Sequence, residues 1–397
     1  MEILEDKALV FRTRNPHKYR IIPKHKIIER NDEGYDVMVY FGLDEVRVLR
    51  NLGVKDVPSP ITRRYDWPGR YKPMAHQVDT ASFLTIHKKA FVFNDPGTGK
   101  TLSALWAADY LMSRGFIRRV LILCPLSIMQ SAWLQDLNNS IIHRSAIVAH
   151  HPKSSRRIEM IQSDYEFVIC NYDGLNPIAD EINNDGRFDL IIVDEANAYK
   201  TMTTKRWKTL KSIVRPDSYL WMMTGTPASQ SPVDAYGLAK LVNPDGVPKF
   251  FTAWRDKVMN KITMFKWAPK HDAKDQVFEA LQPAIRFTKA QCLDLPPVIT
   301  MTREVPLTPQ QAKYYNLLKE RMMVQAAGET ITAVNAAVGM NKLLQISCGA
   351  VYSDSGETLE FDIKNRYKVM REVIDETKQK ILVFETKIPF KAPPQKP

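Results

Sequence analysis

The chain has 397 residues and a mass of 45.6 kDa, which corresponds to about two to three ordinary domains. Its 44% hydrophobic and 25% charged residues are typical of globular proteins and exclude wholesale disorder. A net charge of +12 favours a polyanionic partner, although basic composition alone proves none. No apolar run approaches the ~18 residues of a membrane span. The N-terminus shows no secretory pattern, so we expect a cytoplasmic protein without a membrane partner.

Residues 1–68 predict a small β-rich accessory unit that binds a substrate or a partner. Apolar and polar residues alternate over Lys7–Arg14 and Tyr35–Phe41, and residues 31–34 (NDEG) predict a turn between extended runs. Pro58, Pro60 and Pro68 then interrupt regular structure, which predicts a linker near residues 57–70.

Residues 69–245 show the pattern of a doubly wound α/β domain. Short, continuous apolar runs alternate with helical stretches, and this alternation is typical of a parallel sheet that is buried on both faces. The predicted strands are Ala90–Asn94, Val120–Cys124, Phe167–Asn171, Leu190–Val193 and Tyr219–Thr224.

Three further segments follow. Residues 246–297 are rich in lysine and aromatic residues and predict a basic, helical and irregular connecting insertion. Residues 298–386 predict a second unit, which begins with the extended run Val298–Val305. It continues with helices near residues 309–327, 331–347 and 365–378 and ends in a strand at residues 380–384. Four prolines in residues 387–397 predict a disordered tail.

The sharpest motif is Asn94–Thr101 (NDPGTGKT), which lies between an apolar strand and a predicted helix. Its glycines leave backbone N–H groups free to surround a phosphate, and the helix N-terminus adds a favourable partial charge. In a phosphate loop of this kind, Lys100 would reach the β- and γ-phosphates and Thr101 would bind Mg²⁺. Asn94 stands where the full pattern has its first glycine.

Two adjacent carboxylates follow the predicted strand Leu190–Val193. Asp194 can hold Mg²⁺ through its water shell, and Glu195 can orient and deprotonate an attacking water. An ordinary Asp-Glu turn at a strand end would look the same in isolation. After a phosphate loop in the same sheet pattern, ATP hydrolysis is favoured. We therefore predict Glu195, Lys100 and Asp194 as catalytic residues and Thr101 and Asp194 as the Mg²⁺ ligands.

A hydroxyl-rich turn, Thr224-Gly225-Thr226-Pro227, ends the next predicted strand. Thr224 and Thr226 can hydrogen-bond to the Asp194-Glu195 loop, so Thr224, Gly225 and Thr226 are candidate coupling residues. In their order, GKT, DEAN and TGTP resemble the motifs of helicase superfamily two, and specifically those of its Swi/Snf-type translocase branch.

The resemblance covers roughly residues 70–386. Residues 71–77 look like the segment that reads adenine, with Gln77 in the base-contacting position. Residues 121–128 and Trp133 are similar to a DNA-backbone motif, and residues 170–173 match the strand-end motif that follows it. Residues 306–311 and 380–384 resemble parts of a second RecA-like lobe. DEAN replaces the usual DEAH or DEAD, which changes only the coupling residue, Asn197. In its overall sequence the chain is similar to phage-encoded members of this branch, which would place it in the host cytoplasm.

What the resemblance implies is an α/β fold: a RecA-like, doubly wound parallel sheet of the P-loop NTPase class, with a partial second RecA-like lobe. The implied activity is ATP hydrolysis, with ATP and Mg²⁺ as cofactors, coupled to movement on DNA or its remodelling. Duplex or branched DNA is the implied partner, together with replication, repair or recombination proteins. Ser127 and Tyr172 are candidates for contacts to the DNA backbone. The candidate nucleotide-binding residues are Gln77, Asp95, Pro96, Gly97, Thr98, Gly99, Lys100 and Thr101.

Two basic runs are candidates for phosphate contacts along DNA. Lys200–Arg215 contains six basic residues and no acidic one. Lys249–Lys274 contains seven basic residues against two acidic ones, interleaved with aromatic residues. Contacts of this kind supply affinity but little sequence information. The alternative for each run is a solvated face.

No stretch after Phe384 resembles the late motifs of the second lobe, which contain a Gln and paired Arg residues. We therefore expect a chain that binds ATP and Mg²⁺ in its first lobe, hydrolyses ATP slowly and does not translocate as a monomer. A truncated, hydrolysis-poor module that binds ATP and DNA is the alternative to a working motor. A third alternative, another phosphate-loop enzyme such as a nucleotide kinase or a transporter ATPase, is disfavoured by the TGTP motif.

Overall fold

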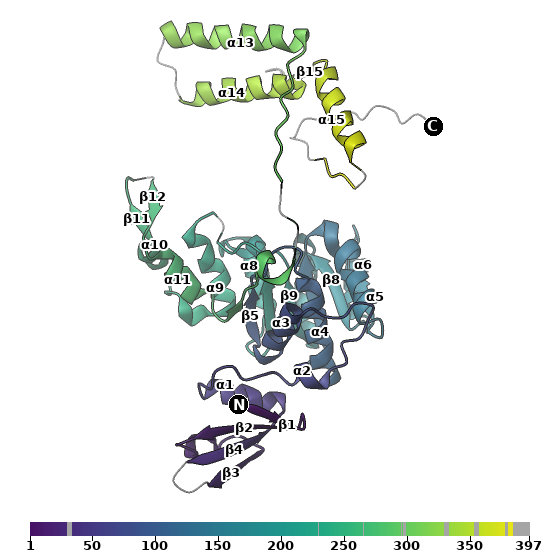
Figure 1. Cartoon of the computed structure of the whole chain (residues 1–397), viewed down its shortest axis with the longest axis vertical. Helices are drawn as coiled ribbons and strands as arrows, with labels where there is room; N and C mark the ends of the chain where they lie inside the picture. The colour runs from purple at the N-terminus through teal and green to yellow at the C-terminus, as the bar shows by residue number, and fades with distance from the viewer. Residues whose placement is uncertain are drawn as a thin grey trace. The chain divides into compact units, whose positions relative to one another are not determined.

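The computed structural model describes residues 1–29, 34–228, 230–264, 266–294, 296, 299–328, 333–352, 357–377 and 380–383 (Figure 1). The chain forms two compact units, Met1–Leu295 and Pro296–Pro397. None of the helices within these ranges combines the length and the apolar character needed to cross a lipid bilayer.

The first unit begins with an antiparallel sheet of strand order β1-β2-β4-β3. Its strands are β1 (Glu2–Leu4), β2 (Ala8–Thr13), β3 (His25–Glu29) and β4 (Tyr35–Tyr40). Most of the predicted turn, residues 31–33, lies outside the described residues. Helix α1 (Leu43–Asn51), which we did not predict, packs Val46 and Leu49 against Leu9, Val37 and Val39 of the sheet. The strands that we predicted at residues 7–14 and 35–41 are present.

Arg47 of α1 attaches this sheet to the rest of the first unit. Its Nη2 atom donates to the carbonyl oxygen of Thr85 at 2.7 Å and to the hydroxyl of Tyr219 at 2.6 Å. The predicted linker contains one short helix, α2 (Ile61–Arg64). The N-terminal sheet is thus joined by a partly buried arginine as well as by the linker.

The main sheet of the first unit, within the described residues, has seven strands in the order β13-β5-β10-β9-β6-β8-β7. Every neighbouring pair is parallel, which confirms the predicted parallel sheet. All residues of β6 and β10 are buried, because helices cover both faces of the sheet. Side chains on both faces of these strands therefore pack in an apolar environment. The strands are β5 (Lys89–Val92), β6 (Arg119–Cys124), β7 (Ala146–Val148), β8 (Phe167–Asn171), β9 (Phe188–Val193), β10 (Tyr219–Met223) and β13 (Ala284–Ile285).

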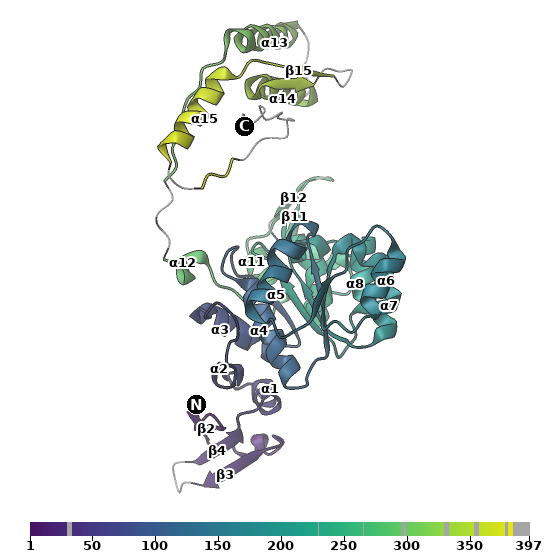
Figure 2. The same cartoon turned by 90° about the vertical axis from the view of Figure 1, so that its right-hand side faces the viewer.

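Helices cover the two faces of this sheet, as Figure 2 shows. One core contains Trp106 and Trp133, from the face of α3 (Ala75–Ile86), α4 (Lys100–Ser113) and α5 (Gln135–Ser140). The other core contains Tyr199 and Trp254. On that face lie α6 (Ser154–Gln162), α7 (Ala179–Asp185), α8 (Lys205–Ile213), α9 (Ala235–Val242), α10 (Phe251–Val258) and α11 (Ala273–Ala280).

Residues 246–297 are more regular than the predicted irregular insertion. After α10 comes an antiparallel hairpin of β11 (Met259–Lys261) and β12 (Trp267–Pro269), and after α11 comes β13, with Ala284 opposite Phe91 of β5. The main sheet therefore extends past the predicted boundary at residue 245. Because β13 has only two residues, it forms by pairing with the backbone groups of β5 and not through an apolar pattern of its own. The short helix α12 (Lys289–Cys292) follows.

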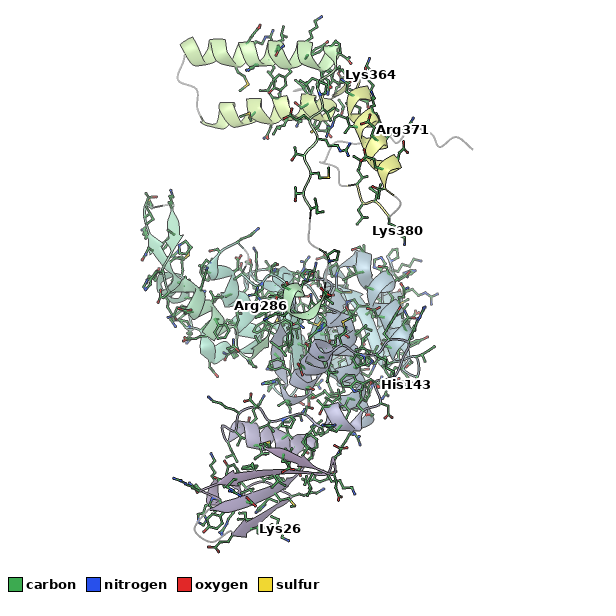
Figure 3. The ribbon with its side chains drawn as sticks, in the orientation of Figure 1. Lys26, His143, Arg286, Lys364, Arg371 and Lys380 are labelled. Carbon is green, nitrogen blue, oxygen red and sulfur yellow. The ribbon has the colours of Figure 1, made fainter. Side chains whose placement is uncertain are left out.

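A buried polar network around Asp109 anchors α4 in the first unit. Its carboxylate accepts hydrogen bonds from the Tyr65 hydroxyl at 2.6 Å, from Nε2 of His143 at 2.9 Å and from Nε of Arg144 at 2.6 Å. Figure 3 labels His143.

Asp109→Ala would leave the Arg144 guanidinium without this partner, so we expect the free energy of unfolding to fall by about 3 kcal/mol, measured by urea unfolding. Glu159→Ala, which breaks an exposed pair with Arg156, should cost less than about 1 kcal/mol. If both variants lost the same free energy of unfolding, the Asp109 network would not anchor α4.

The second unit contains the three predicted helices, here α13 (Pro309–Gly328), α14 (Ala333–Cys348) and α15 (Lys364–Glu376). An antiparallel pair, β14 (Ala350–Tyr352) and β15 (Thr358–Glu360), completes it. Gln311 of α13 is buried, and its Nε2 atom donates to the carbonyl oxygen of Ile346 at 2.8 Å, which ties α13 to α14.

The strand predicted at residues 380–384 is absent at residues 380–383, and Phe384 lies outside the described residues. An apolar run becomes a strand only where a neighbouring strand pairs with its backbone groups. In the described part of this unit, β14 and β15 pair only with each other. The partial second RecA-like lobe, like the other domain assignments, stays a prediction.

Candidate nucleotide-binding site

Three loops that carry the predicted motifs meet at one edge of the main sheet. Strand β10 lies between β5 and β9, with Met223 opposite Val92 and Met222 opposite Val193. The loops that follow these parallel strands therefore leave the sheet side by side at its carboxyl edge, where α/β sheets bind their ligands. They are the phosphate loop, the Asp194-Glu195 loop and the TGTP turn.

The phosphate loop is shaped by Gly99, which caps the N-terminus of α4 with a φ of 76°. This backbone conformation favours glycine, and a Cβ at this position would lie 2.0 Å from Nε2 of Gln77 and displace that amide. Lys100 folds back over the loop, and its Nζ atom donates to the carbonyl oxygens of Asn94 at 2.9 Å and Asp95 at 3.3 Å. Burial lowers the pKa of Lys100. A partly buried ammonium whose hydrogen bonds go to neutral carbonyl oxygens has strong affinity for an anion.

The start of α3 packs against the phosphate loop. Oε1 of Gln77 accepts a hydrogen bond from the backbone N–H of Met74 at 2.9 Å, and Nε2 lies 3.5 Å from the carbonyl oxygen of Thr98. Nε2 of His76 lies 2.8 Å from the same carbonyl oxygen. His76 belongs to the predicted adenine-reading segment but was not among our candidate binding residues. Gln77 is thus beside the loop, and its contact with a base stays a prediction.

The carboxylate of Asp194 is oriented from two sides. Its Oδ2 atom accepts a hydrogen bond from the indole Nε1 of the fully buried Trp133 at 3.0 Å. Its Oδ1 atom accepts one from the backbone N–H of Glu195 at 3.0 Å. Burial raises the pKa of Asp194. The indole N–H leaves little rotational freedom to the carboxylate, so Trp133 is a positioning residue for Asp194.

Glu195 lies in the left-handed backbone region, with a φ of 47°, which is uncommon for a residue with a side chain. The hydroxyl of Thr224 lies 3.4 Å from its Oε2 atom. Nδ2 of Asn197 lies 2.8 Å from the carbonyl oxygen of Thr226 and 3.3 Å from Oγ1 of Thr224. The predicted contacts between the TGTP turn and this loop are therefore present. Asn197, at the position where DEAN departs from DEAH, makes most of them.

The TGTP turn also touches the phosphate loop. A Cβ added to Gly225 would lie 2.6 Å from Cδ of Pro96, so glycine is needed for this close approach. Because the turn contacts both other loops, a displacement of either loop changes the contacts of Thr224-Gly225-Thr226. The structure brings together Gln77, residues 95–101, Asp194, Glu195 and the three candidate coupling residues. The function of each stays a prediction.

The two candidates for DNA-backbone contacts lie at the same edge, since Cys124 at the end of β6 pairs with Asn171 at the end of β8. Ser127 is exposed in the turn that follows β6. Tyr172 donates its hydroxyl to the backbone carbonyl of Asp194 at 2.5 Å, and its ring packs edge-on against Tyr199. The hydroxyl of Tyr172 thus supports the Asp194 loop, whereas Ser127 faces solvent.

The basic residues of Lys200–Arg215 fall into two groups, those that form ion pairs within the protein and those that are exposed. Lys200, Arg206 and Arg215 bind Asp234, Asp173 and Asp189 at 3.1, 2.6 and 3.1 Å. Lys205, Lys208 and Lys211 recur every three residues and are exposed on α8. In the second run, Arg255 stacks over Trp267 and Nζ of Lys270 donates to the carbonyl oxygen of Asp256. Part of each run therefore stabilises the fold, and only the remainder is available to a polyanion.

Comparison with curated proteins finds distant relatives. The chain is 25% identical over 299 residues to "Putative protein p41" of Acyrthosiphon pisum secondary endosymbiont phage 1, which covers 72% of this chain and 65% of that protein. It is 25% identical over 177 residues to an uncharacterized ATP-dependent helicase, YqhH, of Bacillus subtilis, which covers 44% of this chain and 30% of the helicase. The chain thus spans less than two thirds of either relative.

Among solved structures, the Sulfolobus solfataricus SWI2/SNF2 ATPase core in complex with dsDNA is similar, with a TM-score of 0.49 and 22% identity over 78% of this chain and 66% of that one. The sequence profile of the SNF2-related domain matches residues 76–349, which is more than half of the chain and includes all three loops of the site. The chain therefore belongs to the SNF2-related family, whose domain is an ATPase- and helicase-like motor.

Proposed function

We propose that this chain hydrolyses ATP and couples the hydrolysis to movement on duplex DNA or to its remodelling. The observation that supports this most strongly is the contact of three motif loops at one sheet edge. Lys100 begins α4 after the phosphate loop that follows β5, and Asp194 and Glu195 follow β9, with β10 between the two strands. Few other reactions need a lysine at a phosphate loop, an oriented carboxylate and a second carboxylate one residue beyond it.

In this proposal each residue has a defined role. Lys100 and the backbone N–H groups of residues 97–101 bind the β- and γ-phosphates, and Gln77 contacts the base. Glu195 accepts a proton from the attacking water. When Glu195 moves, its contacts with the turn of Thr224, Gly225 and Thr226 change, and the turn transmits this movement to the surface.

The oxygen ligands at this edge suit Mg²⁺. The described residues bring together no group of three or more His, Cys, Asp or Glu side chains. Thr101 and Asp194, with the phosphates of the nucleotide, provide the hard oxygen ligands that Mg²⁺ prefers. When bound, Mg²⁺ neutralises charge on the β- and γ-phosphates. The indole of Trp133 holds the Asp194 carboxylate in place for this contact.

Trp133→Phe removes the indole N–H while keeping an aromatic ring in the core. We expect about tenfold weaker binding of a divalent cation to the nucleotide-loaded chain, because hydrogen-bond partners of metal ligands have effects of this size. The measurement is a titration with Mn²⁺ followed by electron paramagnetic resonance.

Trp207→Phe is a matched control, since its Nε1 atom donates to the carbonyl oxygen of Gly237 at 2.8 Å, away from the three loops. It should bind Mn²⁺ as the native chain does. A Trp133→Phe chain with native Mn²⁺ affinity would show that the indole does not position the carboxylate.

The proposal of DNA as partner is supported by charge and by the family. The net charge is +12, and exposed lysines remain on α8 after the internal ion pairs are formed. Further lysines, Lys261 and Lys266, are exposed on either side of the β11–β12 turn. These positions suit contacts to phosphates and not to base edges, so we expect affinity that is independent of sequence and falls steeply with salt.

The experiment that tests the proposal is steady-state ATPase activity with Mg²⁺, with and without duplex DNA. We expect nucleotide binding and a slow turnover that rises when DNA is added. Binding of nucleotide without turnover in either condition would favour the hydrolysis-poor ATP- and DNA-binding module. Failure to bind any nucleotide would refute the proposal.

A further inference from the structure

The segment that follows β13 is fastened directly to the phosphate loop. We call residues 286–289 the strap; Figure 3 labels its first residue, Arg286. The pairing of β13 with β5 continues into the loop, since the backbone N–H of Phe93 donates to the carbonyl oxygen of Ile285 at 2.8 Å and that of Asp95 to Phe287 at 2.9 Å. The strap and the phosphate loop, which lie almost 200 positions apart in the sequence, are thus joined by backbone hydrogen bonds.

Side chains of the phosphate loop hold the strap as well. Oδ1 of Asn94 accepts a hydrogen bond from the backbone N–H of Phe287 at 3.0 Å, and Nδ2 donates to Oγ1 of Thr80 in α3 at 2.9 Å. Oδ2 of Asp95 accepts one from the backbone N–H of Lys289 at 3.0 Å. Asn94 is the residue that replaces the first glycine of the phosphate-loop pattern, and its buried amide would be lost with glycine there. The departure from the pattern therefore builds an anchor for the strap.

The anchor places the side chain of Lys289 over the phosphate loop. Its Cε atom lies 3.6 Å from the point that a Cβ on Gly97 would occupy. Lys289 is exposed and has no ion-pair partner among the residues that the structure describes. The pKa of Lys100 is lowered mainly by burial, and the charge of Lys289 adds to this shift. Two cationic side chains from distant parts of the first unit's sequence thus approach one loop, and their mutual repulsion is relieved when an anion binds between them.

We propose that Lys289 is a second phosphate-binding lysine of this site, which contacts a phosphate of a bound nucleoside di- or triphosphate beside Gly97. This inference rests on the proposed function of the phosphate loop. The contact is a charge-assisted hydrogen bond from a partly solvated ammonium, and its loss corresponds to about a tenfold change in affinity. Because the backbone of Lys289 is held by Asp95, replacing its side chain leaves the strap attached.

The test is the dissociation constant of a fluorescent ATP analogue, measured with purified full-length chain. Lys289→Ala should bind about tenfold more weakly than the native chain with an unchanged thermal midpoint, and Lys289→Arg should restore most of the affinity. Arg286→Ala is the charge-matched control, because Arg286 belongs to the same strap but lines a cavity with Phe278 and Gln282 on the side of α11. It should bind the analogue as the native chain does.

The outcomes separate this inference from the proposed function. If Lys100→Ala weakens binding by about 10²-fold while Lys289→Ala binds like the native chain, Lys289 is not a ligand and the phosphate-loop site still stands. If the native chain binds no nucleotide, the proposed function itself fails. Inorganic tripolyphosphate, used as a competitor, should also lose about tenfold in affinity for the Lys289→Ala chain. An unchanged affinity for tripolyphosphate would overturn the phosphate contact, because the lysine would then touch the base or the sugar.

Discussion

Glu195→Gln is expected to lower kcat for ATP hydrolysis by about 10²–10³-fold while leaving nucleotide affinity within about twofold of the native value. The amide keeps the size of the side chain and still accepts from Thr224, whose hydroxyl lies 3.4 Å from Oε2, but it cannot take the proton of the attacking water. The measurement is single-turnover hydrolysis of ATP at saturating Mg²⁺, together with the affinity of a fluorescent ATP analogue.

Glu181→Gln serves as the control, since this side chain of α7 accepts from Nε2 of Gln162, on the helical layer away from the three loops. It should hydrolyse ATP like the native chain. A Glu195→Gln chain that retains its turnover would show that another group acts as the base. A parallel loss of binding and turnover would show that Glu195 shapes the site and does not act on water.

Lys100→Ala is expected to weaken the binding of ATP by about 10²-fold and to abolish measurable turnover. The ammonium of Lys100 now bonds to the carbonyl oxygens of Asn94 and Asp95, and binding of a nucleotide exchanges these neutral acceptors for charged phosphate oxygens. The phosphate oxygens add the attraction of an ion pair to these hydrogen bonds, and Lys100 is partly buried, so its loss has a large effect. Isothermal titration with ATP and Mg²⁺ provides the measurement.

Lys89→Ala is a matched control for this variant. Lys89 begins β5, at the opposite end of the strand that leads into the phosphate loop, and burial also lowers its pKa. If both alanine variants lost ATP affinity to the same extent, the effect would come from a damaged β5 and not from a lost phosphate contact.

The motif residues could be predicted from the sequence because their chemistry depends on short, local patterns. Glycines before GKT, carboxylates after an apolar strand and a TGTP turn each occupy fewer than ten consecutive residues. The central strands were equally predictable. Strands that are buried on both faces are continuously apolar, and β6 and β10 show this pattern without interruption.

Elements that depend on distant partners could not be predicted in this way. Strand β13 has two residues and forms only because β5 presents unpaired backbone groups. The converse holds at residues 380–383, where an apolar run has no neighbour to pair with in the described part of its unit and is not a strand. A pattern of apolar residues measures the tendency to be buried, whereas a strand also needs a partner for its hydrogen bonds.

The same distinction applies to the candidate site. The sequence by itself determined the loops, their order and the residue types suited to bind a nucleotide with Mg²⁺, since these follow from adjacent positions along the chain. Only the tertiary structure decided that Trp133 orients Asp194 and that the strap places Lys289 over Gly97. Trp133 and Asp194 are 61 positions apart, and Lys289 and Asp95 are 194 apart. Contacts at such separations are set by the pairing of strands and the packing of helices on the sheet, and no local pattern encodes them.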